Sequence, residues 1–224
     1  MKSLRSLFAL FFMIVISAFS MNAQDLSKYR TYAFGMSLAE LRAQLDPQEL
    51  RTKLIQDRPA TIRDVTWWPW ESSGSSLQGE GLWQVLFRFH NGRLYRIFVI
   101  YDRHATRGLT AEDMIEAISA QYGPAARPEV EVTFPTNGLY RSTEKAIAQW
   151  EDSQYSYTLF RSSLSDAFGL VMFSKQLDAQ AELAMAESAR LTEQEAPQKE
   201  AARRNQQAGD LEAARRENKK AIRP

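Results

Sequence analysis

The sequence predicts an α+β protein in which two related helix-plus-sheet units follow one another along the chain. A helix-opening pattern occurs twice, at residues 35–41 and, 73 positions later, at residues 108–114. Short, aromatic-rich segments with strand character and short turns follow each copy. Since short links between neighbouring strands require antiparallel pairing, we expect two antiparallel meanders in one domain, with helices on one sheet face.

Both copies of the repeated pattern read glycine, apolar, hydroxyl, two free positions, acid, apolar. The hydroxyl residues are Ser37 and Thr110, and the acids three positions later are Glu40 and Asp113. The hydroxyl accepts from the backbone N–H three places on, and the acid reaches back to the N–H of the cap residue. Each copy therefore predicts the start of a helix.

The first unit, residues 31–103, is expected to hold a second helix before its strands. Asp46 followed by Pro47 is typical of a helix start, and Leu50, Leu54 and Ile55 would form its apolar face. We expect Pro59 to end this helix, residues 61–71 to form a strand, and the glycine- and serine-rich residues 72–80 to form a flexible connection.

Residues 82–102 predict a hairpin around Asn91-Gly92, the preferred pair for a two-residue type I′ turn. His90 should then oppose Arg93, and Phe89 should oppose Leu94. Strict alternation from this turn predicts one core face. Its members would be Trp83, Val85, Phe87, Phe89, Leu94, Arg96, Phe98 and Ile100.

The second unit, residues 108–175, begins with a helix that carries Met114, Ile118 and Tyr122 at a spacing of four. Gly123-Pro124 should end it. Strands are expected at 130–134, 145–150, 155–161 and 168–174. The charged tail, 176–224, is predicted as helix to about residue 194 and as solvated helix or disorder beyond, with Pro197 and Gly209 as interruptions.

The first 23 residues are typical of a signal peptide. Lys2 and Arg5 precede an unbroken apolar run at residues 7–16, and cleavage can follow either Ser20 or Ala23. We therefore expect an exported protein, periplasmic or secreted, with no transmembrane segment after cleavage and its folded domain at residues 25–175.

Composition excludes several classes of chemistry. The chain has no cysteine, which excludes a disulfide, a thiol nucleophile, a thiolate metal site and a lipidated amino terminus. Removing Lys2 and Arg5 leaves 26 of the 28 basic residues against 27 acidic ones. This near-neutral balance gives no argument for nucleic acid or an anionic membrane as partner.

The candidate catalytic residues are few. Asp102 and His104 share one loop and can form an acid–base pair or contribute to a metal site, but two such groups make neither a zinc site nor a triad. A solvated loop is the preferred interpretation, and no metal or cofactor is predicted. Arg96 on the predicted core face must form an ion pair or reach solvent, or else contact a ligand anion.

A cluster of tryptophans offers a candidate partner site. Strand alternation puts Trp68 and Trp70 on one face and Trp67 on the other, and Pro69 predicts an edge strand or a strand end. Exposed indoles on an edge can bind a partner or a glycan. The alternative is that all three tryptophans are buried at the periphery of the core.

At residues 35–41, and at 108–110 leading to Tyr122-Gly123-Pro124, the chain resembles the β-lactamase-inhibitor-like group of exported proteins. This group includes small outer-membrane-assembly lipoproteins. In it, a glycine-hydroxyl-acid helix opening precedes a strand meander and often ends in glycine-x-proline. The lipidation cysteine of the assembly lipoproteins is absent here. The resemblance implies a non-catalytic, protein-binding role.

Three functions remain open at this point. The first is a non-catalytic exported binding or scaffold protein that contacts a protein or an envelope polymer through Trp67, Trp68 and Trp70. The second is a periplasmic hydrolase or small-ligand-binding protein that uses Arg96, Asp102 and His104. The third is an envelope tether that acts through residues 176–224. The sequence does not distinguish among partners or oligomeric states.

Overall fold

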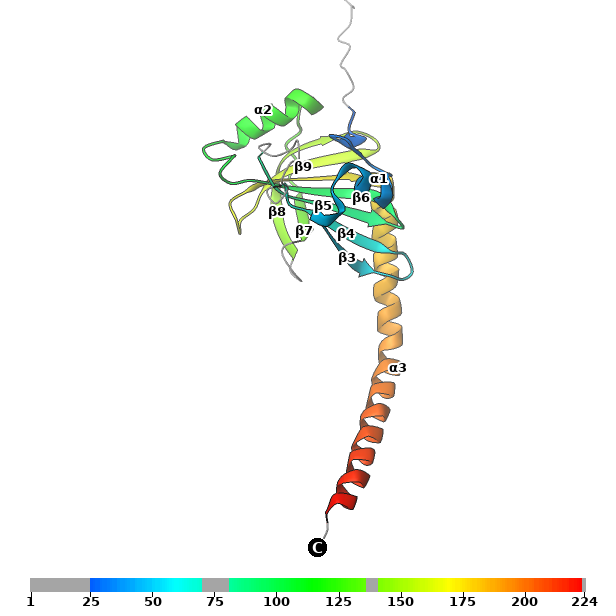
Figure 1. Cartoon of the computed structure of the whole chain (residues 1–224). Coiled ribbons are helices and arrows are strands. Elements are labelled where there is room, and N and C mark those ends of the chain that lie inside the picture. The colour runs from blue at the N-terminus through cyan, green and yellow to red at the C-terminus, as the bar shows by residue number, and fades with distance from the viewer. Residues whose placement is uncertain (1–24, 70–80, 136–140, 223–224) are drawn as a thin grey trace, which may run out of the picture.

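A computed structural model describes residues 25–69, 81–135 and 141–222 of the chain (Figure 1). The predicted signal peptide, the predicted connection at 72–80 and Trp70 lie outside these residues. The helices are α1 (Leu38–Gln44), a 3-10 turn η1 (Pro47–Glu49), α2 (Ala111–Tyr122) and α3 (Lys175–Ala221). The strands are β1 (Lys28–Tyr29), β2 (Tyr32–Ala33), β3 (Leu50–Gln56), β4 (Ile62–Trp67), β5 (Leu82–His90), β6 (Arg93–Tyr101), β7 (Glu131–Pro135), β8 (Arg141–Glu151), β9 (Tyr155–Arg161) and β10 (Phe168–Ser174).

The predicted α+β class with two helix-plus-meander units is confirmed. Strands β3 to β6 follow α1, strands β7 to β10 follow α2, and all eight form one antiparallel sheet. The strand order is β3-β4-β5-β6-β10-β9-β8-β7. The fourth strand of one unit therefore pairs with the fourth strand of the other, as in a duplicated unit arranged about a two-fold axis.

Both predicted helix openings are confirmed as capping boxes. The Ser37 hydroxyl accepts from the Glu40 N–H at 3.2 Å, and Glu40 accepts from the Ser37 N–H at 2.6 Å. Thr110 and Asp113 repeat the arrangement at 3.2 and 2.7 Å. These hydrogen bonds, chiefly those from the backbone of the cap residues, lower the pKa of the Glu40 and Asp113 carboxyls.

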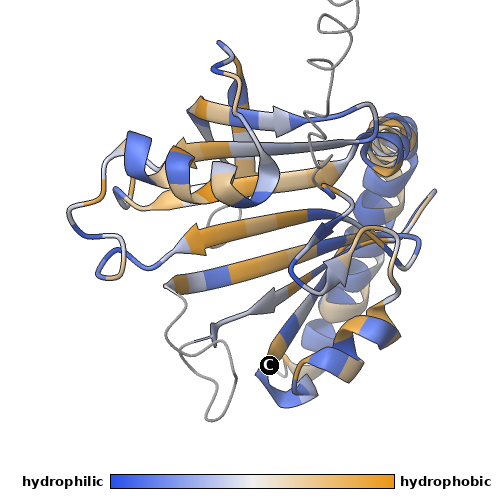
Figure 2. Ribbon diagram, turned by 90° about the horizontal axis from the view of Figure 1, so that it is seen from above, coloured by the Kyte–Doolittle hydropathy of each residue, from blue (hydrophilic) through white to orange (hydrophobic). Residues whose placement is uncertain are grey.

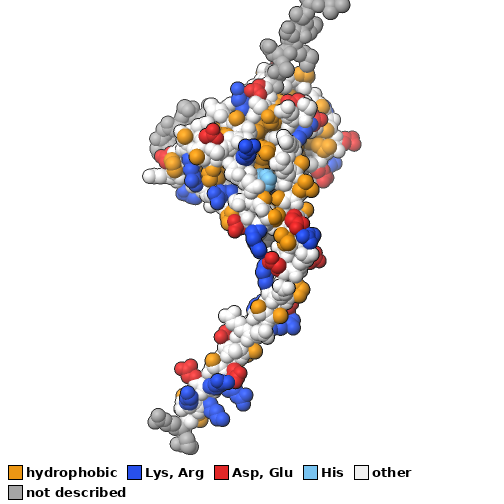
Figure 3. Space-filling model, turned by 90° about the vertical axis from the view of Figure 1, so that its right-hand side faces the viewer, with side chains coloured by type: hydrophobic (Ala, Val, Ile, Leu, Met, Phe, Trp, Pro, Cys, Tyr) orange, Lys and Arg blue, Asp and Glu red, His pale blue; other side chains and the backbone are white. Residues whose placement is uncertain are grey.

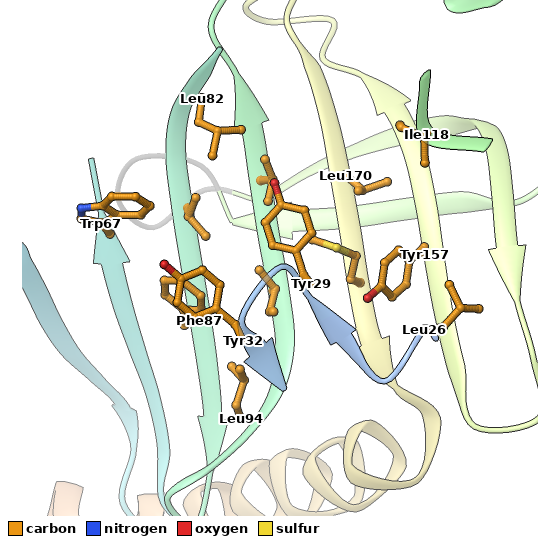
Figure 4. Close-up of a cluster of buried hydrophobic side chains, with 14 of the residues drawn as sticks. Leu26, Tyr29, Tyr32, Trp67, Leu82, Phe87, Leu94, Ile118, Tyr157 and Leu170 are labelled. Atoms are coloured by element: carbon orange, nitrogen blue, oxygen red, sulfur yellow. The ribbon is translucent and has the colours of Figure 1, made fainter. Parts of the chain in front are cut away.

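One sheet face carries the main core under α1, α2 and the β1–β2 hairpin. Figure 4 shows this hairpin over the central strands, where Tyr29 and Tyr32 lie among Phe87, Leu94 and Leu170. The Tyr32 and Phe87 rings meet edge to face, with centroids 4.8 Å apart. The hydrophobic residues of the described chain are concentrated on the strands, as Figure 2 shows.

The opposite face is covered at one end by the start of α3. Leu177, Ala181 and Met185 of this helix pack on Ile62 and Tyr95. A second apolar cluster lies on the sheet beyond them, formed by Leu86, Phe98, Phe134, Phe160 and Val171. The two faces therefore differ, since one is closed by short helices and the other is only partly covered.

The predicted second helix is wrong. Asp46 does cap η1, but the chain leaves this turn at Leu50 and forms β3, which pairs with β4 from Leu50 opposite Trp67 to Gln56 opposite Ile62. Leu54 and Ile55, expected on a helix face, are 51% and 40% exposed on this edge strand. Pairing with β4 overrides the local helix signal.

The turn of the predicted hairpin is confirmed, but its register holds only near the turn. Asn91 and Gly92 both have positive φ, 48° and 78°, His90 opposes Arg93, and Phe89 opposes Leu94. The next pair is Arg88 with Arg96, so Tyr95 is an extra residue in a bulge. Beyond this bulge, the residues of β6 lie on the sheet face opposite to the one predicted, whereas Val85, Phe87 and Phe89 of β5 keep theirs. Arg96, Phe98 and Ile100 therefore lie on the partly covered face, and Ile97 and Val99 join the main core.

The predicted helical tail is confirmed and extends further than expected. Helix α3 runs without a break through Pro197 and Gly209, which were expected to interrupt it. At 1.5 Å per residue, its 47 residues span about 70 Å. Residues 196–222 are exposed throughout, and Figures 1 and 3 show this part projecting from the domain with charged side chains along it. Among the described residues, no helix has the length and apolar character that crossing a membrane requires.

Candidate functional site

An apolar groove opens on the partly covered face, at the ends of β5 and β6 away from α3. It encloses about 540 Å³. Its apolar lining consists of Trp83, Ile100, Tyr101, Phe134, Leu164 and Ala167. Polar residues complete the lining, namely Gln84, Asp102, Arg103, His104, Ser162 and Ser165. This size lies within the range of small-molecule sites, about 300–1,000 Å³.

Large apolar side chains are exposed at the rim of the groove. Trp83 at the start of β5 is 44% exposed, and Leu164 in the loop between β9 and β10 is 74% exposed. Trp83 was predicted to face the core, but a register shift between Leu82 and Gln84 turns it out of the regular alternation. A bulged tryptophan beside a cavity offers a large apolar surface to a ligand at little cost in conformational entropy.

Phe160 and Phe134 form the floor next to the groove. Their rings lie 4.4 Å apart between centroids, so the two side chains make contact across β8, the strand between β7 and β9. The tip of the Phe160 ring can lie close to β10 because residue 169 there is glycine. A Cβ at Gly169 would meet the Phe160 ring at 2.2 Å.

Asp102 and His104 both line the groove, but the carboxylate does not face the imidazole as a catalytic pair requires. The Asp102 Oδ1 accepts from the backbone N–H groups of His104 and Ala105, at 2.5 and 3.1 Å. The Thr106 N–H and hydroxyl both donate to the Asp102 carbonyl oxygen, at 3.0 and 2.9 Å. Asp102 thus fixes the loop that carries His104, whose side chain is exposed.

A second hollow of about 330 Å³, the basic pocket, adjoins the groove. Arg103 and His104 line both. The basic pocket is completed by Thr106, Arg107, Gly108, Leu109, Arg161, Asp166 and Phe168. Arg161 forms an ion pair with Asp166 at 2.8 Å, and its guanidinium lies 5.0 Å from the centroid of the Phe168 ring.

Arg96 lies apart from Asp102 and His104, at the other end of β6 under α3. Its Nε donates to Asp178 of α3 at 2.7 Å, and its guanidinium also pairs with Glu182 at 3.4 Å. Burial raises the pKa of the Asp178 carboxyl, although the Arg96 charge favours the ionised form. Of the two functions predicted for Arg96, the structural ion pair is the one observed. The structure does not bring the three candidate ligand contacts together.

Trp67 does not lie on the expected exposed edge. Trp67 is fully buried in the main core, and its indole N–H donates to Glu49 at 3.3 Å. Strand β4 ends at Trp67, as Pro69 suggested, but β3 covers it, so it is not an edge strand. Trp68 is half-buried just beyond the strand. A partner contact at Trp68 stays a prediction, whereas Trp67 is not accessible for one.

The groove and the basic pocket also contain residues that no sequence pattern marks as site residues. Strand alternation predicts Trp83 in the core, and no sequence pattern predicts a role for Leu164 in the groove or for Arg161 in the basic pocket. The composition of the 102–107 loop, with Arg103 and Arg107 beside His104, was the available signal for a basic surface. The contribution of β9 and of the 162–167 loop depends on strand pairing and could not be seen locally.

In the described part of the chain, no group of three or more histidine or acidic side chains is arranged to hold a metal ion. The rim of the groove is suited to holding an apolar group, because Trp83 and Leu164 are exposed there. The Asp102 carboxylate is occupied by backbone N–H groups of its own loop. Comparisons with protein-family models, with curated proteins and with solved structures found no match to this chain.

Proposed function

We propose that this chain is an exported, non-catalytic binding protein that holds an apolar ligand in the groove between β5, β6 and the 162–167 loop. The observation that carries the proposal is the pair Trp83 and Leu164, two large, exposed apolar side chains that line one cavity of about 540 Å³. Large exposed apolar surfaces beside a hollow are typical of ligand sites. Export rests on the pattern of the first 23 residues.

Binding without catalysis is favoured by the hydrogen bonds of Asp102. The carboxylate of a catalytic triad must accept from the imidazole to orient it, whereas this carboxylate accepts from two backbone N–H groups of its own loop. The Ser162 hydroxyl accepts from the Ser165 N–H at 3.3 Å within its own turn. Both side chains stabilise the loops that form the groove.

A neutral apolar fluorophore, N-phenyl-1-naphthylamine, tests the proposal directly. We expect it to bind the purified protein with increased emission, and we expect Leu164→Ser and Trp83→Ala each to weaken binding about tenfold. Leu183→Ser is the matched control, because Leu183 is 72% exposed on α3, against 74% for Leu164. Equal loss in Leu164→Ser and Leu183→Ser, or no binding by the wild type, would contradict the proposal.

The hydrolase alternative is tested on the same protein. Activity profiling on ester and cell-wall substrates should give no turnover above background. Turnover that disappears in His104→Ala would replace the binding function with a catalytic one.

A second candidate function, an envelope tether, is favoured by the projecting part of α3. Its residues 196–222 are all exposed, although the first turns of the helix are anchored to the sheet. Deleting residues 197–224 removes most of the projecting part and leaves the anchored turns in place. The tether function requires that this deletion change localisation or the recovery of a crosslinked partner, and it is wrong if both stay as in the wild type.

A further inference from the structure

The basic pocket and the apolar groove adjoin each other, and together they form a recess with two chemically different ends. Arg103 and His104 line both hollows, so the two hollows lie side by side at these residues. One end presents Trp83, Ile100 and Phe134, and the other presents guanidinium groups. A ligand that fills the recess therefore meets apolar side chains at one end and positive charge at the other.

The basic pocket has an excess of positive charge. Three guanidinium groups, those of Arg103, Arg107 and Arg161, stand against the single carboxylate of Asp166. Asp166 pairs with Arg161, through Nη2 to Oδ2 at 3.0 Å and Nε to Oδ1 at 2.8 Å. Within residues 25–69, 81–135 and 141–222, no side chain pairs with Arg103 or Arg107. Two cations are thus left for an incoming anion.

The loop that carries these two arginines is ordered by its own hydrogen bonds. Besides the bonds to Asp102, the Arg107 N–H donates to the His104 carbonyl at 3.4 Å, and the Leu109 N–H donates to the Thr106 carbonyl at 3.1 Å. The Asp102 N–H also donates to the Gly81 carbonyl at 2.7 Å. A loop held in this way loses little conformational entropy when a ligand binds.

We propose that the recess binds one amphiphile, with its apolar chain in the groove and its anionic head, a carboxylate or a phosphate, in the basic pocket. This inference rests on the proposed function and names the chemical class of its ligand. Guanidinium groups pair with carboxylates and phosphates through charge-assisted, bidentate hydrogen bonds. Leu109, 41% exposed at the edge of the basic pocket, extends the apolar surface there.

Amphiphiles that share a twelve-carbon chain separate the contribution of the head from that of the chain. Dodecanoate, dodecyl phosphate, dodecyl maltoside and dodecyltrimethylammonium are titrated below their micelle concentrations, with displacement of N-phenyl-1-naphthylamine as the readout. We expect the two anions to bind at least about tenfold more tightly than the neutral and cationic compounds. Whichever anion binds more tightly identifies the source of the head, a fatty acid or a lipid phosphate, and both support the proposal.

A double variant tests the arginines. Arg103→Gln with Arg107→Gln should remove the preference for anions, because binding of the two anions should weaken far more than binding of dodecyl maltoside. The matched control is Arg42→Gln with Lys53→Gln, which removes two exposed cations from α1 and β3 and should keep the preference.

Each contrary result of these titrations identifies which part of the proposal is wrong. If the neutral compound binds as tightly as the anions, or if the arginine variant keeps the preference, the anionic head is wrong while the apolar groove stands. If the preference is lost equally in the control pair, it reflects overall charge and the proposed pocket is wrong. If none of the four compounds displaces the fluorophore, the amphiphile is wrong. If the fluorophore itself does not bind, the proposed function fails as well.

Discussion

Gly169 leaves room for the Phe160 ring, which packs on Phe134 of the groove. It lies on β10 under the Phe160 ring, where a Cβ would approach the ring at 2.2 Å. Gly169→Ala must displace Phe160, and with it the contact to Phe134. We expect a loss of about 1–3 kcal/mol in the free energy of unfolding, since overpacking of a buried site costs about this much. Urea unfolding measures it.

Gly209→Ala is the matched control for this substitution. Gly209 lies in the exposed part of α3, and a Cβ there would meet nothing within 4 Å. Alanine is about 1 kcal/mol more favourable than glycine in a helix interior, so this variant should gain helicity and lose no stability. If Gly169→Ala is as stable as Gly209→Ala, the close packing of Phe160 on β10 is not what the structure indicates.

The buried hydroxyl of Tyr95 makes the free energy of unfolding decrease at alkaline pH. Burial raises the pKa of its hydroxyl to about 12, although Arg88 and Arg96 lie close enough to favour the phenolate. An unfolded tyrosine has a pKa of about 10, so below pH 10 both states keep the proton and the contribution to stability is complete. Between about pH 10 and 12 the unfolded state loses the proton while the folded state retains it, so stability falls, by about 2–3 kcal/mol for this residue.

Urea unfolding at a series of pH values from 8 to 11 measures this dependence. Tyr95→Phe removes the titrating group, so its stability should fall less steeply above pH 10 than that of the wild type. The same slope in both proteins would show that Tyr95 is not the group responsible.

At the scale of elements, α3 is held on the sheet by a buried ion pair between Arg96 and Asp178. The side chains are 16% and 12% exposed. Removal of one partner leaves an uncompensated charge, which typically costs about 3–5 kcal/mol, whereas an apolar replacement of both is often neutral. Arg96→Met and Asp178→Leu should each destabilise the protein, and the double variant should be more stable than either single variant. Additive losses in urea unfolding would contradict this coupling.

The elements that could be predicted from sequence are those fixed by neighbouring residues. Capping boxes at Ser37 and Thr110 and the turn at Asn91-Gly92 involve partners within three positions, and all three are confirmed. Strand β3 was mistaken for a helix because Leu50 and Leu54 have helical spacing, and only pairing with β4 shows that they belong to a strand. The bulge at Tyr95 could be suspected only from Arg96, because strict alternation from the turn puts this charge on the core face, and the pairing of Arg88 with Arg96 is what shows the extra residue.

At the scale of the whole molecule, the candidate site could be predicted only in part. Asp102 and His104 were found because they share one loop. Leu164 of the groove and Arg161 of the basic pocket come from the second unit, and Trp83 comes from the first, so the two hollows exist only where the units meet. No pattern of neighbouring residues in the sequence predicts which residues of the two units meet there. The sheet order, with β6 beside β10, is what brings these residues together.

The same order predicts that neither unit folds alone. Residues 25–104 would end in β6 with an unpaired edge, and residues 108–224 would leave the edge of β10 open. The main core also continues across the boundary, from Val85 and Val99 to Leu170 and Met172.

We expect each fragment by itself to show weak, non-cooperative unfolding by circular dichroism, and an equimolar mixture to regain the cooperative transition of the intact chain. The groove is formed by both fragments, so binding of N-phenyl-1-naphthylamine should return only in the mixture. Cooperative unfolding of either fragment alone would mean that the duplicated units are separate domains, and a mixture that stays unfolded would mean that their covalent connection is needed for the central pairing of β6 with β10.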